Sequence, residues 1–168
     1  INLEGNQLTG DFPSELGNLS LLRTLFLSQN QLTGTIPTTF ANLTNLQDLY
    51  LWFNQLSGPI PTVIGDMISL RNIDLNSNQF DGTIPPELGN ATNLRNLSIP
   101  ANQLIGEIPV ELGNLSNLEY LWLDNNQLTG SIPIELNNLS NLFSLAVARN
   151  NLSGSVPELS NLTQLNEL

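Results

Sequence analysis

The side chains that could perform acid–base, nucleophilic or metal chemistry are few in this chain. It contains no histidine and no cysteine, and its four basic residues are all arginine. Disulfides, thiolate nucleophiles and the usual zinc ligands are therefore excluded. Proton transfer would depend on aspartate and glutamate alone, and no acidic spacing motif for calcium is present. The sequence therefore argues against an enzyme, and we expect no catalytic residues, no metal and no cofactor.

The residues suited to binding are more distinctive, because arginine, tryptophan and tyrosine recur at a few related positions. Arginine and large aromatic side chains dominate binding hot spots, and paired guanidinium groups can hold a carboxylate, sulfate or phosphate. The candidate ligand-binding residues are Phe26, Tyr50, Trp52, Phe53, Arg71, Arg95, Tyr120, Trp122 and Arg149.

A 24-residue repeat determines where these residues lie. Asparagine, apolar, glycine and proline columns each recur in seven successive repeats, which is the signature of a repeat architecture. We therefore expect residues 1–168 to form a single domain of about seven repeats. The asparagine column consists of Asn6, Asn30, Asn54, Asn78, Asn102, Asn126 and Asn150.

Each column predicts a local structure. Leu25 and Leu27 alternate with Phe26 and Ser28, which predicts a short strand with the leucines buried and their neighbours outside. One strand per repeat would stack into a parallel sheet. Each recurring asparagine would bond to the backbone of adjacent turns and so form a continuous ladder. The glycine column allows positive φ or close approach, and each proline favours an extended residue before it. Apolar residues three apart after the proline, such as Leu112 and Leu115, predict a 3₁₀ turn on the outer side.

These columns carry a family resemblance. The run LEYLWLDNNQLTGSIP at residues 118–133 resembles the plant-type leucine-rich repeat, LxxLxLxxNxLxGxIPxxLGNL, and the match extends over essentially the whole chain. The resemblance implies a leucine-rich-repeat solenoid, a right-handed superhelix with a concave parallel sheet and short 3₁₀ or helical turns on its convex side. The family occurs in ectodomains of plant receptor kinases and receptor-like proteins, and in secreted microbial proteins. It implies an extracellular or cell-surface location.

The ends depart from the pattern of the plant ectodomains. Those usually carry paired-cysteine caps at both ends, and this chain has no cysteine. Repeat proteins need terminal caps for solubility. We therefore expect a segment of a longer protein, or one whose uncapped ends are covered by partners, including other copies of the chain.

The resemblance places the candidate binding residues on the concave sheet. Since adjacent strands are about 4.8 Å apart, Arg71 and Arg95 would stand side by side as an anion site. Alternatively, Arg95 pairs with Glu119 in the next repeat.

The aromatic candidates divide into two patches on the same sheet. The first is Phe26, Tyr50, Trp52 and Phe53; the second, about three strands away, is Tyr120 with Trp122. Ligand contact is one interpretation of these patches. Cross-strand packing that stabilises the sheet is another, and contact with a flanking segment or a second copy is a third.

The net charge and the lack of a long apolar run limit the kinds of partner that this chain could bind. A net charge of −11 disfavours nucleic acid and anionic membranes, and no run of 18 apolar residues offers membrane insertion. We expect a protein or peptide ligand, with a glycan as an alternative. Six sequons that fall in one outer turn of the repeat are candidate N-glycosylation sites. They are Asn18, Asn42, Asn90, Asn114, Asn138 and Asn161.

The repeat and the residues that vary on it are compatible with three functions. The leading one is an extracellular binding module that uses the concave face. The second is a structural adhesin, matrix or filament subunit assembled from such solenoids. The third is ice binding, which some members of the family perform and which requires a regular threonine array. The best such column is interrupted: it reads Thr9, Thr33, Ser57, Asp81, Ile105, Thr129 and Ser153.

Overall fold

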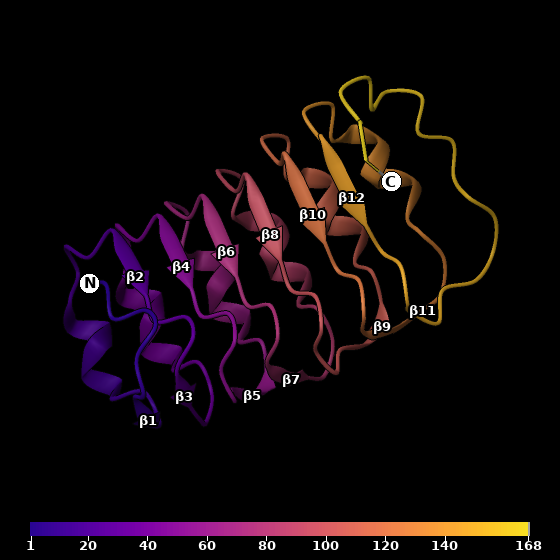
Figure 1. Cartoon of the computed structure of the whole chain (residues 1–168). Coiled ribbons are helices and arrows are strands. Elements are labelled where there is room, and N and C mark those ends of the chain that lie inside the picture. The colour runs from indigo at the N-terminus through magenta and orange to yellow at the C-terminus, as the bar shows by residue number, and fades with distance from the viewer. Residues whose placement is uncertain (168) are drawn as a thin grey trace.

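Alternating apolar residues form the strand of each repeat in the computed structural model, which describes residues 1–167. In the first of these strands Leu25 is buried, whereas Thr24 and Phe26 on the other face are half-buried. Six such strands form one parallel sheet, and each residue pairs with its equivalent 24 positions on (Figure 1). The strands are β2 (Thr24–Phe26), β4 (Asp48–Tyr50), β6 (Asn72–Asp74), β8 (Asn96–Ser98), β10 (Tyr120–Trp122) and β12 (Ser144–Ala146). The predicted parallel sheet is confirmed.

A second series of short strands follows the turn of each repeat and lies along one flank of the solenoid (Figure 1). These strands form three two-stranded sheets, and single backbone hydrogen bonds, such as Ser57 N–H to the Gly34 carbonyl at 2.8 Å, link one pair to the next. The pairs are β1 (Thr9–Gly10) with β3 (Gln31–Leu32), β5 (Ser57–Pro59) with β7 (Gln79–Asp81), and β9 (Ile105–Glu107) with β11 (Gln127–Thr129). The glycine column lies here, with φ between 71° at Gly82 and 84° at Gly10, so its predicted positive φ is confirmed.

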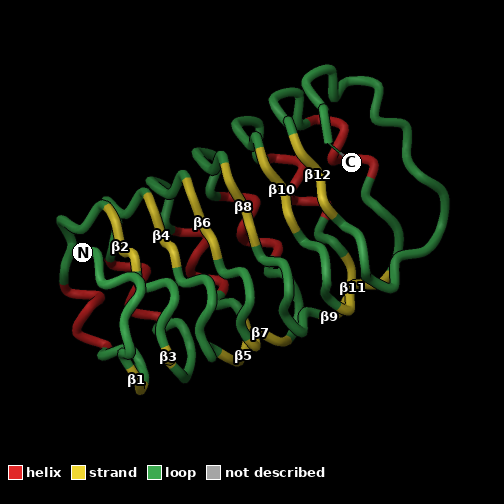
Figure 2. Tube along the Cα trace, in the orientation of Figure 1, coloured by secondary structure: helices red, strands yellow, loops and turns green. Residues whose placement is uncertain are grey.

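Each of the first six repeats carries one 3₁₀ helix after its proline, on the side opposite the main sheet (Figure 2). The helices are η1 (Ser14–Asn18), η2 (Thr38–Asn42), η3 (Thr62–Asp66), η4 (Pro86–Asn90), η5 (Val110–Asn114) and η6 (Ile134–Asn138). They stack so closely that a Cβ on Gly89 would clash with the carbonyl oxygen of Glu111. After β12 the described chain continues as loop and turn until Glu167, which forms a parallel β-bridge with Ser144 of β12. No helix among residues 1–167 has the length and apolar character needed to cross a bilayer.

The core and the asparagine ladder run the length of the solenoid. A continuous series of buried apolar side chains fills the space between the sheet and the 3₁₀ helices. Beside it, the Asn78 amide donates to the carbonyls of Leu51 and Leu75, at 3.0 and 3.1 Å, and its oxygen accepts from the Leu56 N–H at 3.0 Å. Equivalent bonds recur at Asn54, Asn102 and Asn126, so the predicted ladder is confirmed.

Candidate ligand-binding face

The concave face is formed by the strand side chains that point away from the core, together with the residue that follows each strand at the sheet margin. Residues equivalent to Arg23, Thr24, Phe26 and Ser28 occupy the strand positions, and those equivalent to Gln29 occupy the margin. All four arginines, both tryptophans and both tyrosines of the chain fall at these positions. Register pairing therefore brings these residues onto one surface.

The first aromatic patch forms as expected around strands β2 and β4. The rings of Phe26 and Tyr50 meet edge to face with centroids 5.0 Å apart, and those of Trp52 and Phe53 meet at 5.6 Å. A recess of about 290 Å³ lies between Phe26, Tyr50, Trp52 and Glu4. Glu4 was missing from the sequence candidates, although it stands 24 residues before Ser28 in the column that contains Trp52.

Phe53 occupies an unfavourable backbone conformation. Its φ is 52°, in the left-handed region that costs a residue with a Cβ about 1–2 kcal/mol, and its side chain remains 57% exposed. The turn imposes this φ at every equivalent position, including Ser77 and Asn125. An exposed phenylalanine at such a position neither fills the core nor suits the turn.

The second aromatic patch lies on β10 and β12. The Tyr120 ring contacts Trp122 at 5.5 Å and Phe143 at 5.8 Å between centroids. Trp122 donates its indole N–H to the Ser144 hydroxyl at 2.9 Å, which fixes the ring against the sheet. The patch adjoins a second recess of about 290 Å³. That recess is lined by Glu119, Tyr120, Asn141, Phe143 and Gln164. Phe143 thus joins Tyr120 and Trp122, the two members of this patch that the sequence predicts.

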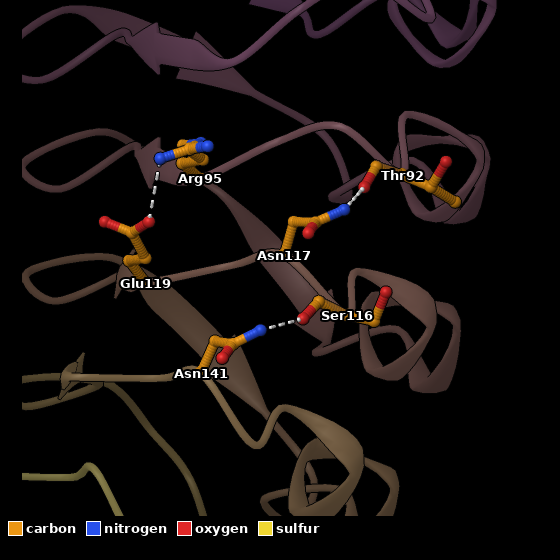
Figure 3. Close-up of polar contacts among 6 residues, drawn as sticks. All are labelled: Thr92, Arg95, Ser116, Asn117, Glu119 and Asn141. Atoms are coloured by element: carbon orange, nitrogen blue, oxygen red, sulfur yellow. Dashed lines mark hydrogen bonds and ion pairs between the residues drawn. The ribbon is translucent and has the colours of Figure 1, made fainter.

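The arginines of the face are partly engaged. Arg71 and Arg95 lie on neighbouring turns, and the Arg95 N–H donates to the Arg71 carbonyl at 2.8 Å. The Arg95 guanidinium forms an ion pair with Glu119 at 3.3 Å (Figure 3), which is the alternative that the sequence leaves open. Both side chains are exposed, so the pair contributes only about 0–1 kcal/mol. Arg149 donates to the Asn125 amide oxygen at 3.3 Å.

Two carboxylates of the face accept hydrogen bonds from side chains of the next strand. Asp48 accepts from the Asn72 amide at 2.6 Å, and Asp74 accepts from the Ser98 hydroxyl at 2.9 Å. Burial raises the pKa of Asp74 above its ordinary value, although its hydrogen bonds from the Asn76 N–H and from Ser98 oppose that shift. The pKa of Tyr50 is raised by burial first, and then by the negative charges of Asp48 and Asp74.

Three serines of this face are buried rather than exposed. Ser28 was expected outside, yet it is 0% exposed; Ser98 and Ser144 are similarly covered. A hydroxymethyl group is short, so larger neighbours on adjacent strands cover it.

The six sequon asparagines are all exposed, and five of them end a 3₁₀ helix. The asparagine three residues further on is structural instead: Asn117 and Asn141 donate to the Thr92 and Ser116 carbonyls of the preceding repeat (Figure 3).

Comparison with known families agrees with this architecture. Residues 1–104 match the model of the leucine-rich repeat region, and residues 117–139 match that of the leucine-rich repeat. The chain belongs to the leucine-rich-repeat family. No curated protein matches it.

Solved structures similar to this chain include plant receptor ectodomains. The ectodomain of the Arabidopsis thaliana receptor kinase GASSHO1/SCHENGEN3, in complex with CASPARIAN STRIP INTEGRITY FACTOR 2, is 40% identical over 99% of this chain, with a TM-score of 0.98. The Arabidopsis receptor kinase HAESA, in complex with the peptide hormone IDA and the co-receptor SERK1, is 41% identical over 100% of this chain, with a TM-score of 0.97. This chain spans 20% and 28% of the length of those two chains.

A plant ice-binding protein is also similar. It is 28% identical over 100% of this chain and 63% of its own, with a TM-score of 0.83. The same solenoid therefore occurs in proteins of different function, so the function of this chain has to be argued from its surface.

Proposed function

We propose that this chain is an extracellular or cell-surface binding module that holds a peptide or protein ligand on its concave face. The observation that carries the proposal is the concentration of every arginine, tryptophan and tyrosine on that one face. Folding does not require this distribution, because the core is completed by leucine, isoleucine and phenylalanine. Aromatic residues and arginine on a shared surface are the composition of binding hot spots.

The spacing of the two patches favours an extended ligand. They are centred on β4 and β10, three strand steps apart, or about 14 Å at 4.8 Å per step. An extended peptide rises about 3.3 Å per residue, so about four residues would join them. The complexes of the similar receptor ectodomains with peptide ligands support this kind of partner.

A random-peptide phage library tests the proposal. Peptides selected on the wild-type chain would be titrated against Trp52→Ala and against the double variant Arg71→Ala, Arg95→Ala. The matched control is Gln79→Ala, which lies exposed on flanking strand β7. We expect each concave variant to weaken binding at least tenfold while the control binds like wild type, with unchanged unfolding midpoints throughout. Equal binding by all of these variants would refute the assignment of the concave face.

Ice binding is a second candidate, supported by the similarity to the plant ice-binding protein. Its regular array would have to lie on the flank, where Thr33 and Thr129 belong to one column. Asp81 and Ile105 interrupt that column, and both are exposed. Thermal hysteresis of the purified chain distinguishes the two functions, and the concave-face proposal predicts none.

A further inference from the structure

The recess of the first patch has the size of a single side chain. Its volume is about 290 Å³, which is below the range of about 300–1,000 Å³ for pockets that hold drug-sized molecules. Phe26 and Tyr50 come from neighbouring strands, and Trp52 follows Tyr50 by two residues on the same face. Three of its four walls are therefore aromatic, and Glu4 supplies the fourth.

Aromatic walls of this kind favour a flat cation. The ring faces of tryptophan and tyrosine attract a guanidinium within about 6 Å of their centroids. Guanidinium also stacks on aromatic rings and is more weakly hydrated than an ammonium group. Phe26 and Tyr50 pack edge to face, and this geometry does not occupy both faces of both rings.

The charge around the recess has the complementary sign. The Glu4 carboxylate makes no hydrogen bond or ion pair within residues 1–167, where the one ion pair is Arg95 with Glu119. Asp48 and Asp74 are near enough to contribute to the raised pKa of Tyr50. Together with the exposed Glu4, these carboxylates attract a cation toward the recess.

From these three observations we infer that the recess of Glu4, Phe26, Tyr50 and Trp52 binds an arginine side chain of the ligand. The guanidinium stacks against the aromatic walls and donates to the Glu4 carboxylate. An apolar side chain would leave that carboxylate without a donor. The inference rests on the proposed function, because it takes the ligand to be a peptide or protein.

The second recess is a control within the same molecule. It also has aromatic walls, Tyr120 and Phe143, and the same volume of about 290 Å³. Its acid, Glu119, already pairs with Arg95. It therefore lacks the free carboxylate on which the first recess depends.

The experiment uses N-acetyl-arginine amide as the probe and N-acetyl-citrulline amide, its uncharged isostere, as the matched control. The readouts are the ¹⁵N-indole NMR signals of Trp52, which lines the first recess, and of Trp122, which contacts Tyr120 at the edge of the second; Trp122→Phe assigns them. We expect the arginine probe to shift the Trp52 signal saturably and to leave Trp122 unshifted, with citrulline binding at least tenfold more weakly. Equal binding of citrulline, or equal shifts at both tryptophans, would overturn the inference.

One variant tests the charged contact. Glu4→Gln should weaken the arginine probe about tenfold, whereas Glu87→Gln, which removes an exposed charge from η4 on the opposite side, should not change it. Unchanged affinity in Glu4→Gln would also overturn the inference.

Failure of this inference can be distinguished from failure of the proposed function. Library peptides that lack arginine yet depend on Trp52 would leave the binding module intact and refute the arginine site. A saturable arginine probe, together with a library that yields no concave-face binder, would support the site and refute the peptide-binding function.

Discussion

Replacing Asn78 by alanine tests how the asparagine ladder stabilises the solenoid. The side chain makes four hydrogen bonds: its oxygen accepts from the Leu56 N–H, and its amide donates to three carbonyls, those of Leu51, Leu75 and Asn76. If these bonds were independent, their loss would cost about 4 kcal/mol in hydrogen bonds alone. The structure predicts less.

The three carbonyls keep a second partner each when Asn78 is removed. Leu51 O still accepts from the Asn54 amide, and Leu75 O from the Asn102 amide. Asn76 O still accepts from the Phe53 N–H at 2.9 Å.

Only the buried Leu56 N–H loses its partner in this substitution. A buried donor without a partner costs about 1–3 kcal/mol, so we expect a loss of about 2 kcal/mol.

The assay is urea unfolding, followed by tryptophan fluorescence and circular dichroism together, because repeat arrays can depart from two-state behaviour. Asn6→Ala is the matched control, since Asn6 belongs to the same column but is exposed and bonds only to Leu3 O and Glu4 O. It should cost less than about 0.5 kcal/mol. Amide exchange at Leu56 should accelerate in Asn78→Ala. A loss equal to that of the control, or one above about 4 kcal/mol, would refute the reasoning about shared carbonyls.

Three further predictions concern single residues. At Phe53, where φ is 52°, glycine should be about 1 kcal/mol more stable than alanine by urea unfolding; the opposite order would contradict a left-handed residue there. The raised pKa of Asp74 means that the folded state binds its proton more tightly than the unfolded state. Its stabilising contribution is therefore full below the ordinary pKa of 3.8 and is lost as the pH rises through the higher folded value. The free energy of unfolding of wild type minus that of Asp74→Asn should thus fall from acid to neutral pH, and a constant difference would be inconsistent with burial of that carboxyl. The chain also has a sequon, Asn96-Leu97-Ser98, on strand β8, where the Asn96 amide oxygen is buried. When the chain is secreted from eukaryotic cells, mass spectrometry should show a glycan lost in Asn114→Gln but not in Asn96→Gln.

The scaffold could be predicted from the sequence because each fixed column has one structural role. The asparagine at position 78 and the glycine at 82 each appear in the structure with the role that their chemistry predicts. The register of the main sheet follows from the 24-residue repeat, since each of its strands pairs with its equivalent 24 residues on, whereas the flanking strands pair at an offset of 22 residues.

The details of the face could not be predicted in the same way, because they depend on which side chain covers which. The 24-residue repeat predicts that the Ser28 side chain lies on the solvent-facing side of the sheet, yet Ser28 is buried in the structure. The repeat also predicts that Arg71 lies beside Arg95, but it does not predict that the Arg95 side chain pairs with Glu119. Glu4 and Phe143 reach the two recesses from columns in which other repeats carry unrelated residues, so no recurring pattern marks them.

The most direct test of the concave-face account is an NMR map of amide shifts on binding a peptide selected from the phage library. The account predicts that the shifts concentrate on β4, β6, β8 and β10, with the indole signals of Trp52 and Trp122 among the largest. Shifts that concentrate on the 3₁₀ helices or on the flanking strands, with both indole signals unmoved, would contradict it.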